Sequence, residues 1–200
     1  MKKMILFQVM ALSLLTAQSQ LNYGLKGGLN IANIGGSDVE DNKARIGFFL
    51  GGYLEAPLIP NITIQPELLY SAQGFGIKRT GDDLKVPISF LLVPVMGKYT
   101  FNSGVFLETG PQLGFLLSAK YKVGGESENA KKDFQKTVFS WNFGLGYANL
   151  APNLGANLRF NLGLSRIFQD GDAQIFYRVF QIGVYYKLSE GSGGGKSKKK

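Results

Sequence analysis

The stretch NLGANLRFNLGLS, residues 153–165, alternates between two kinds of residue along its whole length. Its even-numbered positions hold only leucine, alanine and phenylalanine, and its odd-numbered positions hold asparagine, glycine, arginine and serine. Because successive side chains of a β-strand point to opposite faces, this pattern predicts a strand with one apolar face and one polar or small face.

The same alternation recurs along the chain, and no segment has the period of a helix. Eight strands are expected, of which the fourth is the least regular because residues 90–93 are apolar without alternation. The predicted strands are residues 21–31, 45–58, 62–75, 86–101, 104–121, 138–149, 154–165 and 176–188.

The connections between these strands alternate in length. Residues 32–44, 76–85, 122–137 and 166–175 are long and polar, whereas residues 59–61, 102–103 and 151–153 are short turns. An even number of strands with this alternation is typical of an outer-membrane barrel, whose tight turns face the periplasm and whose long loops face outside. We therefore expect an all-β fold, an eight-stranded antiparallel up-and-down transmembrane β-barrel with both termini in the periplasm.

A soluble barrel of the lipocalin type would have the same alternation with the two faces exchanged. Two features favour the membrane barrel: aromatic residues lie near the strand ends of the apolar face, as in interfacial girdles, and glycines crowd the other face, as in a cramped interior. The aromatic residues are Tyr23, Tyr99, Phe101, Tyr121, Phe139, Tyr147, Phe176 and Tyr186. The glycines are Gly47, Gly51, Gly110, Gly114, Gly144, Gly146, Gly155 and Gly163.

The composition excludes several classes of function. The 200 residues include no cysteine and no histidine, which removes disulfides, thiol nucleophiles, triad-type bases and the commonest metal ligand. Six lysines near the two termini account for most of the net charge of +8, and the rest of the chain carries only +2. A nearly neutral body argues against a nucleic-acid partner.

The two ends of the chain are expected to lie outside the barrel, which we predict at residues 20–188. Residues 1–19 have the features of a signal peptide: Lys2 and Lys3, then an apolar stretch, then small residues for cleavage after Ser19 or after Ala17. Residues 189–200 are a flexible tail rich in glycine, serine and lysine.

The polar face predicts a set of charged residues in the lumen. Following the alternation, these are Lys26, Glu55, Glu67, Glu108, Lys120 and Arg159, with Lys98 as a further candidate. Such charges could line a gated pore or an ion site, or they could pair with one another and fill the interior. The second interpretation is favoured because bulky residues also point inward and eight strands enclose little space. Those bulky residues are Phe49, Tyr53, Leu69, Phe106 and Leu116.

Three other patterns are weaker. Gly24, Gly27 and Gly28 lack the following helix that a phosphate-binding loop needs, so they are interpreted as strand glycines. The acidic residues at 38–41 and 170–172 lack the spacing of a calcium motif and are interpreted as solvated turns. Lys131, Lys132 and Lys136 could touch lipopolysaccharide phosphates, but neighbouring acidic residues favour an ordinary loop. No catalytic, cofactor or metal site is predicted.

The last strand resembles the C-terminal signal that the outer-membrane insertion machinery reads. Gln181 is followed two residues on by Gly183, and then by the hydrophobic Tyr186 and Leu188 at alternating positions. The chain continues for twelve residues beyond this pattern, where the signal often ends a protein. The resemblance implies that the insertion machinery is a partner.

The chain from about residue 21 to 188 also resembles the PorT-like outer-membrane β-barrel family. The resemblance rests on GLKGGLN at 24–30, QPELLYS at 65–71, VPVMGKY at 93–99 and LETGP at 107–111. It implies a small barrel in the outer membrane of a Gram-negative bacterium. The family's eponym is linked to protein secretion, and most members have no assigned activity.

These observations order three functional hypotheses. The first is a non-enzymatic outer-membrane barrel with a plugged polar lumen, in a structural, adhesive or secretion-associated role through its loops and periplasmic ends. The second is a narrow channel for ions or small solutes. The third is a membrane-embedded enzyme, which ranks last because the small barrel enzymes it would resemble need a catalytic histidine. The expected surroundings are outer-membrane lipid and lipopolysaccharide.

Overall fold

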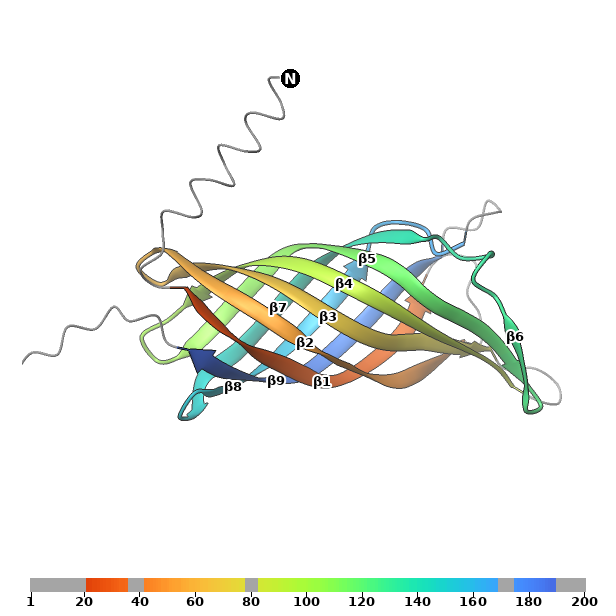
Figure 1. The fold of residues 1–200 in the computed structure, drawn as a ribbon, viewed down its shortest axis with the longest axis horizontal. Helices are drawn as coiled ribbons and strands as arrows, with labels where there is room; N and C mark the ends of the chain where they lie inside the picture. The colour runs from red at the N-terminus through yellow and green to blue at the C-terminus, as the bar shows by residue number, and fades with distance from the viewer. Residues whose placement is uncertain (1–20, 36–41, 78–82, 169–174, 190–200) are drawn as a thin grey trace, which may run out of the picture.

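Eight long antiparallel strands close into a barrel in the computed structural model, which describes residues 21–35, 42–77, 83–168 and 175–189 (Figure 1). Neighbouring strands pair in chain order, and β9 pairs back with β1. The predicted fold is therefore confirmed. The strands are β1 (Asn22–Gly35), β2 (Asn42–Ile59), β3 (Ile62–Ile77), β4 (Leu84–Thr100), β5 (Val105–Val123), β6 (Glu126–Asn129), β7 (Thr137–Ala151), β8 (Leu154–Gly163) and β9 (Phe176–Ser189).

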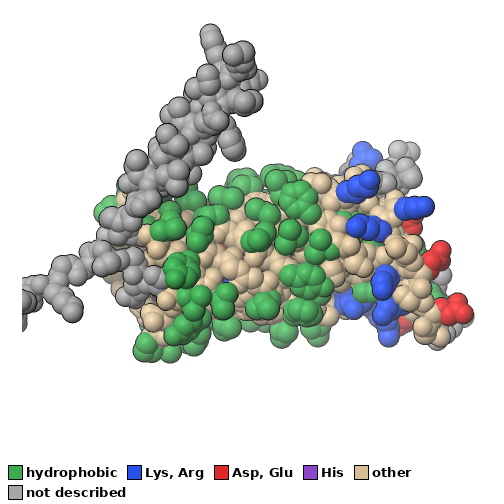
Figure 2. Space-filling view, in the orientation of Figure 1, with side chains coloured by type: hydrophobic (Ala, Val, Ile, Leu, Met, Phe, Trp, Pro, Cys, Tyr) green, Lys and Arg blue, Asp and Glu red, His purple; other side chains and the backbone are tan. Residues whose placement is uncertain are grey.

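The alternation of residue types sorts side chains between the two faces of the wall. On β2, Leu50 is 60% exposed on the outside, whereas its neighbour Phe49 is 2% exposed on the inside. Large hydrophobic side chains are exposed on all eight barrel strands, and they form a broad band on the face shown in Figure 2, as the lipid-facing surface of an outer-membrane barrel requires. None of the described residues forms a helix long and apolar enough to cross a membrane.

The connections differ between the two ends of the barrel. At the short-turn end, where β1 begins and β9 ends, residues 60–61, 101–104 and 152–153 reverse the chain. Asn61 and Asn153 adopt positive φ values of 68° and 61°, a conformation that asparagine tolerates better than most residues. The opposite end, called here the long-loop end, carries the longer connections and the small strand β6, which pairs with the end of β5. Strand β6 lies within residues 122–137, which the sequence predicted to be a loop.

A bulge in β5 changes which residues face the lumen near the long-loop end. Leu116 lies opposite Phe90, but Ser118 lies opposite the preceding residue of β4, so one residue of β5 is skipped. Because side chains alternate with period two, an extra residue moves every later side chain to the other face. Ala119 is therefore buried and Lys120 is exposed. The prediction that Lys120 lies in the lumen is wrong for this reason.

Candidate functional site

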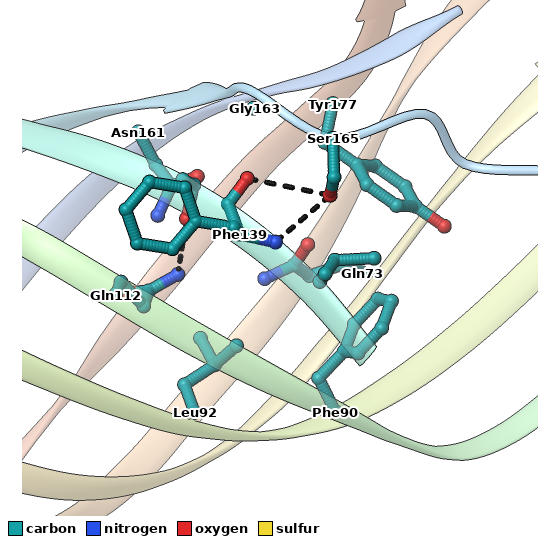
Figure 3. Close-up of a pocket in the computed structure, with 11 residues that line it drawn as sticks. Gln73, Phe90, Leu92, Gln112, Phe139, Asn161, Gly163, Ser165 and Tyr177 are labelled. Carbon is teal, nitrogen blue, oxygen red and sulfur yellow. Dashed lines mark hydrogen bonds between the residues drawn. The ribbon is translucent and has the colours of Figure 1, made fainter. Parts of the chain in front are cut away.

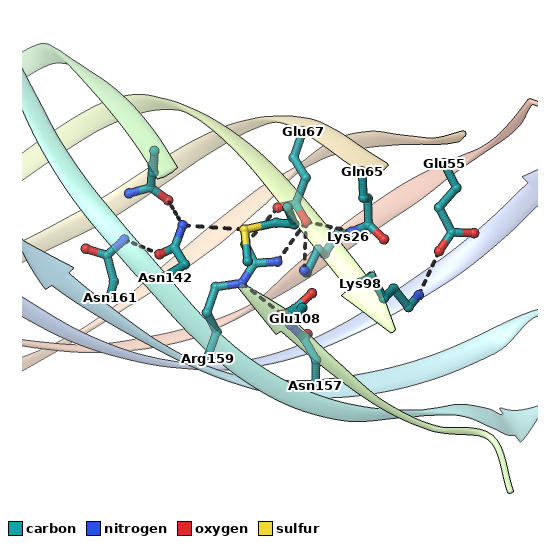
Figure 4. Close-up of polar contacts among 12 residues, drawn as sticks. Lys26, Glu55, Gln65, Glu67, Lys98, Glu108, Asn142, Asn157, Arg159 and Asn161 are labelled. Carbon is teal, nitrogen blue, oxygen red and sulfur yellow. Dashed lines mark hydrogen bonds and ion pairs between the residues drawn. The ribbon is translucent and has the colours of Figure 1, made fainter. Parts of the chain in front are cut away.

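The middle of the lumen contains a charge network of Lys26, Glu67, Glu108 and Arg159, which come from four different strands (Figure 4). Arg159 donates two hydrogen bonds to Glu67, Nη1 to Oε2 at 2.9 Å and Nη2 to Oε1 at 2.8 Å. Its Nε donates to Glu108 Oε1 at 3.0 Å, and Lys26 Nζ lies 3.1 Å from Glu67 Oε1. The two parallel hydrogen bonds from the Arg159 guanidinium to the Glu67 carboxylate form a bidentate ion pair, which is among the strongest hydrogen-bonded pairs in proteins.

A second ion pair lies nearer the short-turn end. Lys98 Nζ donates to Glu55 Oε1 at 2.7 Å, and both side chains are buried. The same ammonium group lies 4.2 Å from the centroid of the Phe106 ring and 5.0 Å from that of Tyr185. A cation over an aromatic face is attracted by the electron density of the ring. The ring of Tyr185 also packs edge-on against Tyr53, so aromatic groups fill the lumen at this level.

The charges that the described residues place in the lumen balance. Lys26, Lys98 and Arg159 face three carboxylates, and each of these six groups has an oppositely charged partner within 3.1 Å. An unpaired buried charge would cost several kcal/mol, so the pairing is what makes this set of residues tolerable inside a narrow barrel. The structure thus places five of the six predicted lumen residues, and the further candidate Lys98, in contact with opposite charges.

Amide and hydroxyl side chains form the next layer toward the long-loop end. Asn30 donates to Ser71 Oγ at 2.8 Å, and Gln181 donates to Asn30 Oδ1 at 2.9 Å. On the other side of the lumen, Asn161 donates to Asn142 Oδ1 at 2.7 Å. These groups satisfy one another in hydrogen bonds, as buried polar groups must.

Glycines on the inner face give these large side chains their space. A Cβ atom at Gly144 would lie 2.7 Å from Glu108 Oε1, and one at Gly155 would lie 2.2 Å from the Tyr185 ring. Contacts below 3.0 Å are not tolerated without displacement of the neighbour. The glycines that the sequence assigned to the lumen thus lie directly beneath the bulky side chains.

The long-loop end of the lumen is closed by a hydrophobic plug. Its members come from the barrel strands and from two long connections, which contribute Ala130, Phe134 and Ile167. The Phe134 ring lies 5.0 Å from that of Phe168, and the backbones of these two residues form a β-bridge. Tyr121, expected on the outer face, instead lies half-buried against Phe134 because of the bulge in β5. The strand residues of the plug include Phe75, Val86, Ile88, Phe90, Leu92 and Tyr177.

Sequence reasoning missed this plug. The two connections are mostly polar in sequence, so the alternation gives no sign of a plug. The signal that could have found them is the placement of apolar residues, Phe134 in one loop and the adjacent Ile167 and Phe168 in the other, within otherwise polar sequence. Such side chains require a partner surface away from water.

A small cavity lies inside the lumen. This cavity of about 10 Å³ lies where the amide layer meets the plug, with Gln73, Gln112 and Tyr177 in its wall (Figure 3). That volume is close to the space occupied by one water molecule. A larger hollow of about 470 Å³ lies at the outer surface near the short-turn end, between the exposed side chains of Tyr23, Leu54 and Leu188. The cavity inside the lumen is too small for a solute.

Of the proposed assembly signal, Gln181 and Gly183 face the lumen, and Tyr186 and Leu188 are exposed on the outer face. Within the described residues, no three metal-binding side chains gather into a site. The acidic residues at 38–41 and 170–172, the proposed signal peptide and residues 190–200 of the tail lie outside the described part of the chain.

Comparisons with known proteins agree with this geometry. Residues 16–169 match the model of a family described as outer membrane protein beta-barrel domain. Curated proteins offer no significant match to the sequence.

Several solved structures are similar. The attachment invasion locus protein Ail of Yersinia pestis, crystallised with the heparin analogue sucrose octasulfate, has a TM-score of 0.53 at 17% identity, covering 84% of this chain and 99% of Ail. Neisserial surface protein A has a TM-score of 0.49 at 17% identity, covering 83% and 97% of the two chains. OprG of Pseudomonas aeruginosa has a TM-score of 0.45 at 10% identity, covering 84% and 95%. At these identities, the likeness to Ail shows a shared fold.

Proposed function

The chain belongs to the family of outer membrane protein beta-barrel domains, and on that premise we propose that it is a closed, non-enzymatic barrel that does not conduct solutes. It acts through its long-loop end, which faces outside the cell, and through its two termini, which lie in the periplasm. Its role is structural, adhesive or secretion-associated. We also propose, on the motifs at 24–30, 65–71, 93–99 and 107–111, that it is PorT-like within this family.

The filled lumen is the observation that carries this proposal. The charge network and the Glu55–Lys98 pair occupy the middle and the short-turn side, and the hydrophobic plug occupies the long-loop side. A conducting pore needs a continuous path wide enough for water and ions, and the cavity between these layers measures only about 10 Å³. A channel would therefore require the plug and the ion pairs to move together.

Single-channel conductance in a planar lipid bilayer tests the closed state. The refolded barrel should give a silent bilayer, with correct folding checked by its altered gel migration before and after heating. The alternative function is a narrow channel for ions or small solutes. Steady openings that change size in Glu67→Gln or Arg159→Gln would establish that alternative and refute the closed barrel.

The orientation can be tested separately, because the chain has no cysteine. Ser127→Cys places a thiol on the exposed strand β6 at the long-loop end, and Ala151→Cys places one at the short-turn end. A membrane-impermeant maleimide added to whole cells should label the first variant and not the second. The reverse result would show that the long loops face the periplasm.

A further inference from the structure

Three lysines form a row on the outer wall at the long-loop end. Lys43 of β2 lies opposite Gly76 of β3, Gly76 lies opposite Lys85 of β4, and Lys85 lies opposite Lys122 of β5. All three lysine side chains are exposed. We call Lys43, Lys85 and Lys122 the lysine row. Because adjacent strands lie about 5 Å apart, the row spans roughly 15 Å around the barrel.

The row concentrates positive charge that is incompletely neutralised. Lys85 and Lys122 are direct cross-strand neighbours, an arrangement in which like charges repel. Lys43 pairs with Asp83, but Lys85 and Lys122 have no ion pair with any residue that the structure describes. Lys120, also exposed, adds a further cation on the same strand as Lys122. An anion bound between these groups would relieve the repulsion.

A glycine separates two lysines of the row. Gly76, between Lys43 and Lys85, has no side chain to fill the gap, and a Cβ atom there would lie 3.4 Å from Lys43 Cβ. Lys43 and Lys85 therefore flank a position of the wall that carries no side chain. Hydrogen bonds from ammonium groups to phosphate oxygens are among the stronger kinds in proteins.

The depth of the row in the membrane identifies the kind of anion. Basic side chains form a band between the hydrophobic belt and the acidic residues further out on the loops (Figure 2). On β5, the exposed Phe115 and Leu117 of the belt precede Lys120 and Lys122, and the acidic Glu126 follows on β6. Cations at the boundary of the apolar band lie at the level of lipid headgroups.

We propose that the lysine row binds the phosphate groups of a phosphorylated glycolipid of the outer leaflet, as found in lipopolysaccharide. The physiological ligand rests on the orientation given under Proposed function, whereas the binding chemistry does not. The row is a better site than Lys131 and Lys132, which lie on a loop beside Asp133, and than Lys136, whose carbonyl oxygen accepts a hydrogen bond from Leu116 at the level of the belt.

Binding of fluorescent lipid A to the refolded barrel in zwitterionic micelles tests the proposal. Three probes are compared: bisphosphorylated lipid A, the same lipid without phosphates, and inorganic phosphate as a competitor. The variant Lys43→Gln/Lys85→Gln/Lys122→Gln should weaken binding of the phosphorylated lipid about tenfold or more, since several charge-assisted contacts are lost. The matched control, Lys131→Gln/Lys132→Gln/Lys136→Gln, removes the same charge from the loop and should weaken binding about threefold or less.

Each other outcome overturns the proposal. Equal losses in the two triple variants would mean general attraction to a basic surface. Equal affinity for the lipid without phosphates would mean binding by the apolar belt, and complete competition by millimolar inorganic phosphate would mean a site for a free anion. Lys122→Glu provides a second check, because it should weaken binding of the phosphorylated lipid yet raise the urea midpoint of the lipid-free barrel by removing the Lys85 repulsion.

A failure of the proposed function can be distinguished from a failure of the lipid-binding proposal. Micelle binding depends neither on a closed lumen nor on orientation, so conductance would refute the closed barrel without changing the lipid result. Protection of Ser127→Cys in whole cells would refute the orientation, and with it the physiological ligand, while the measured affinity would stand.

Discussion

Removing the Glu67 carboxylate should destabilise the folded barrel by about 3–5 kcal/mol, the usual cost of breaking a buried ion pair from one side. Glu67 accepts four hydrogen bonds, two from Arg159 and one each from Lys26 and Gln65. In Glu67→Ala, Lys26 loses its ion-pair partner and Arg159 keeps only Glu108. The interior then carries an unbalanced positive charge that water cannot reach.

The loss of stability in Glu67→Ala depends on the unpaired positive charge that remains. A matched double variant isolates the effect of that charge. Lys26→Met together with Glu67→Gln removes one charge of each sign, so the interior stays neutral and Arg159 keeps its pair with Glu108. Replacing a whole buried pair is often nearly neutral, whereas removing one member is costly. The double variant should therefore recover at least half of the stability lost in Glu67→Ala.

Urea unfolding of the refolded barrel measures both variants. Trp141 is the single tryptophan of the chain and lies on β7, so its fluorescence reports unfolding of the wall. With a denaturant slope of about 2 kcal/mol per molar urea, the expected loss lowers the midpoint by about 2 M. An unchanged midpoint in Glu67→Ala, or an equal loss in the double variant, would refute the argument that charge pairing holds the lumen together.

Three further predictions concern other layers of the barrel. Gly155→Val should lower the urea midpoint or prevent refolding, because its side chain would collide with the Tyr185 ring. Ala119→Asp should be strongly destabilising, whereas Lys120→Asp on the outer face should change the free energy of unfolding by about 1 kcal/mol or less. Phe134→Ala should loosen the plug and speed tryptic cleavage of the adjacent loop, since a buried aromatic side chain stabilises by about 3–5 kcal/mol.

The outcomes that would contradict these predictions are equally definite. Normal refolding of Gly155→Val would show that the inner glycines are not required for space. Similar stabilities of the two aspartate variants would refute the bulge in β5. An unchanged cleavage rate in Phe134→Ala would show that the loop is held by contacts other than the plug.

The fold was predictable because it depends on a pattern that the sequence displays directly. Alternation along a strand determines which side chains share a face, and alternating loop lengths determine the up-and-down topology. Lys26, Glu55, Glu67, Glu108 and Arg159 were assigned to the lumen by this rule, and the structure places them there.

The alternation along each strand does not indicate which side chains meet across the lumen. Glu67 and Arg159 are 92 positions apart, and nothing in either strand states which cation meets which carboxylate. The position of Lys120 depended on a one-residue bulge that alternation does not reveal. The hydrophobic plug depended on Phe134 folding back from a loop, a tertiary contact without a local signature.

The closure of the barrel has a consequence for the order of events during folding. The side chains of Asn30 and Gln181, joined across the β1–β9 seam, are separated by 151 positions. One edge of strand β1 therefore keeps unpaired backbone amide and carbonyl groups until β9 pairs with it. Such an open edge can pair with strands of other chains. Contacts this distant in sequence form slowly. A chain truncated before β9 should accumulate as aggregates, because the seam that protects its first strand is never made.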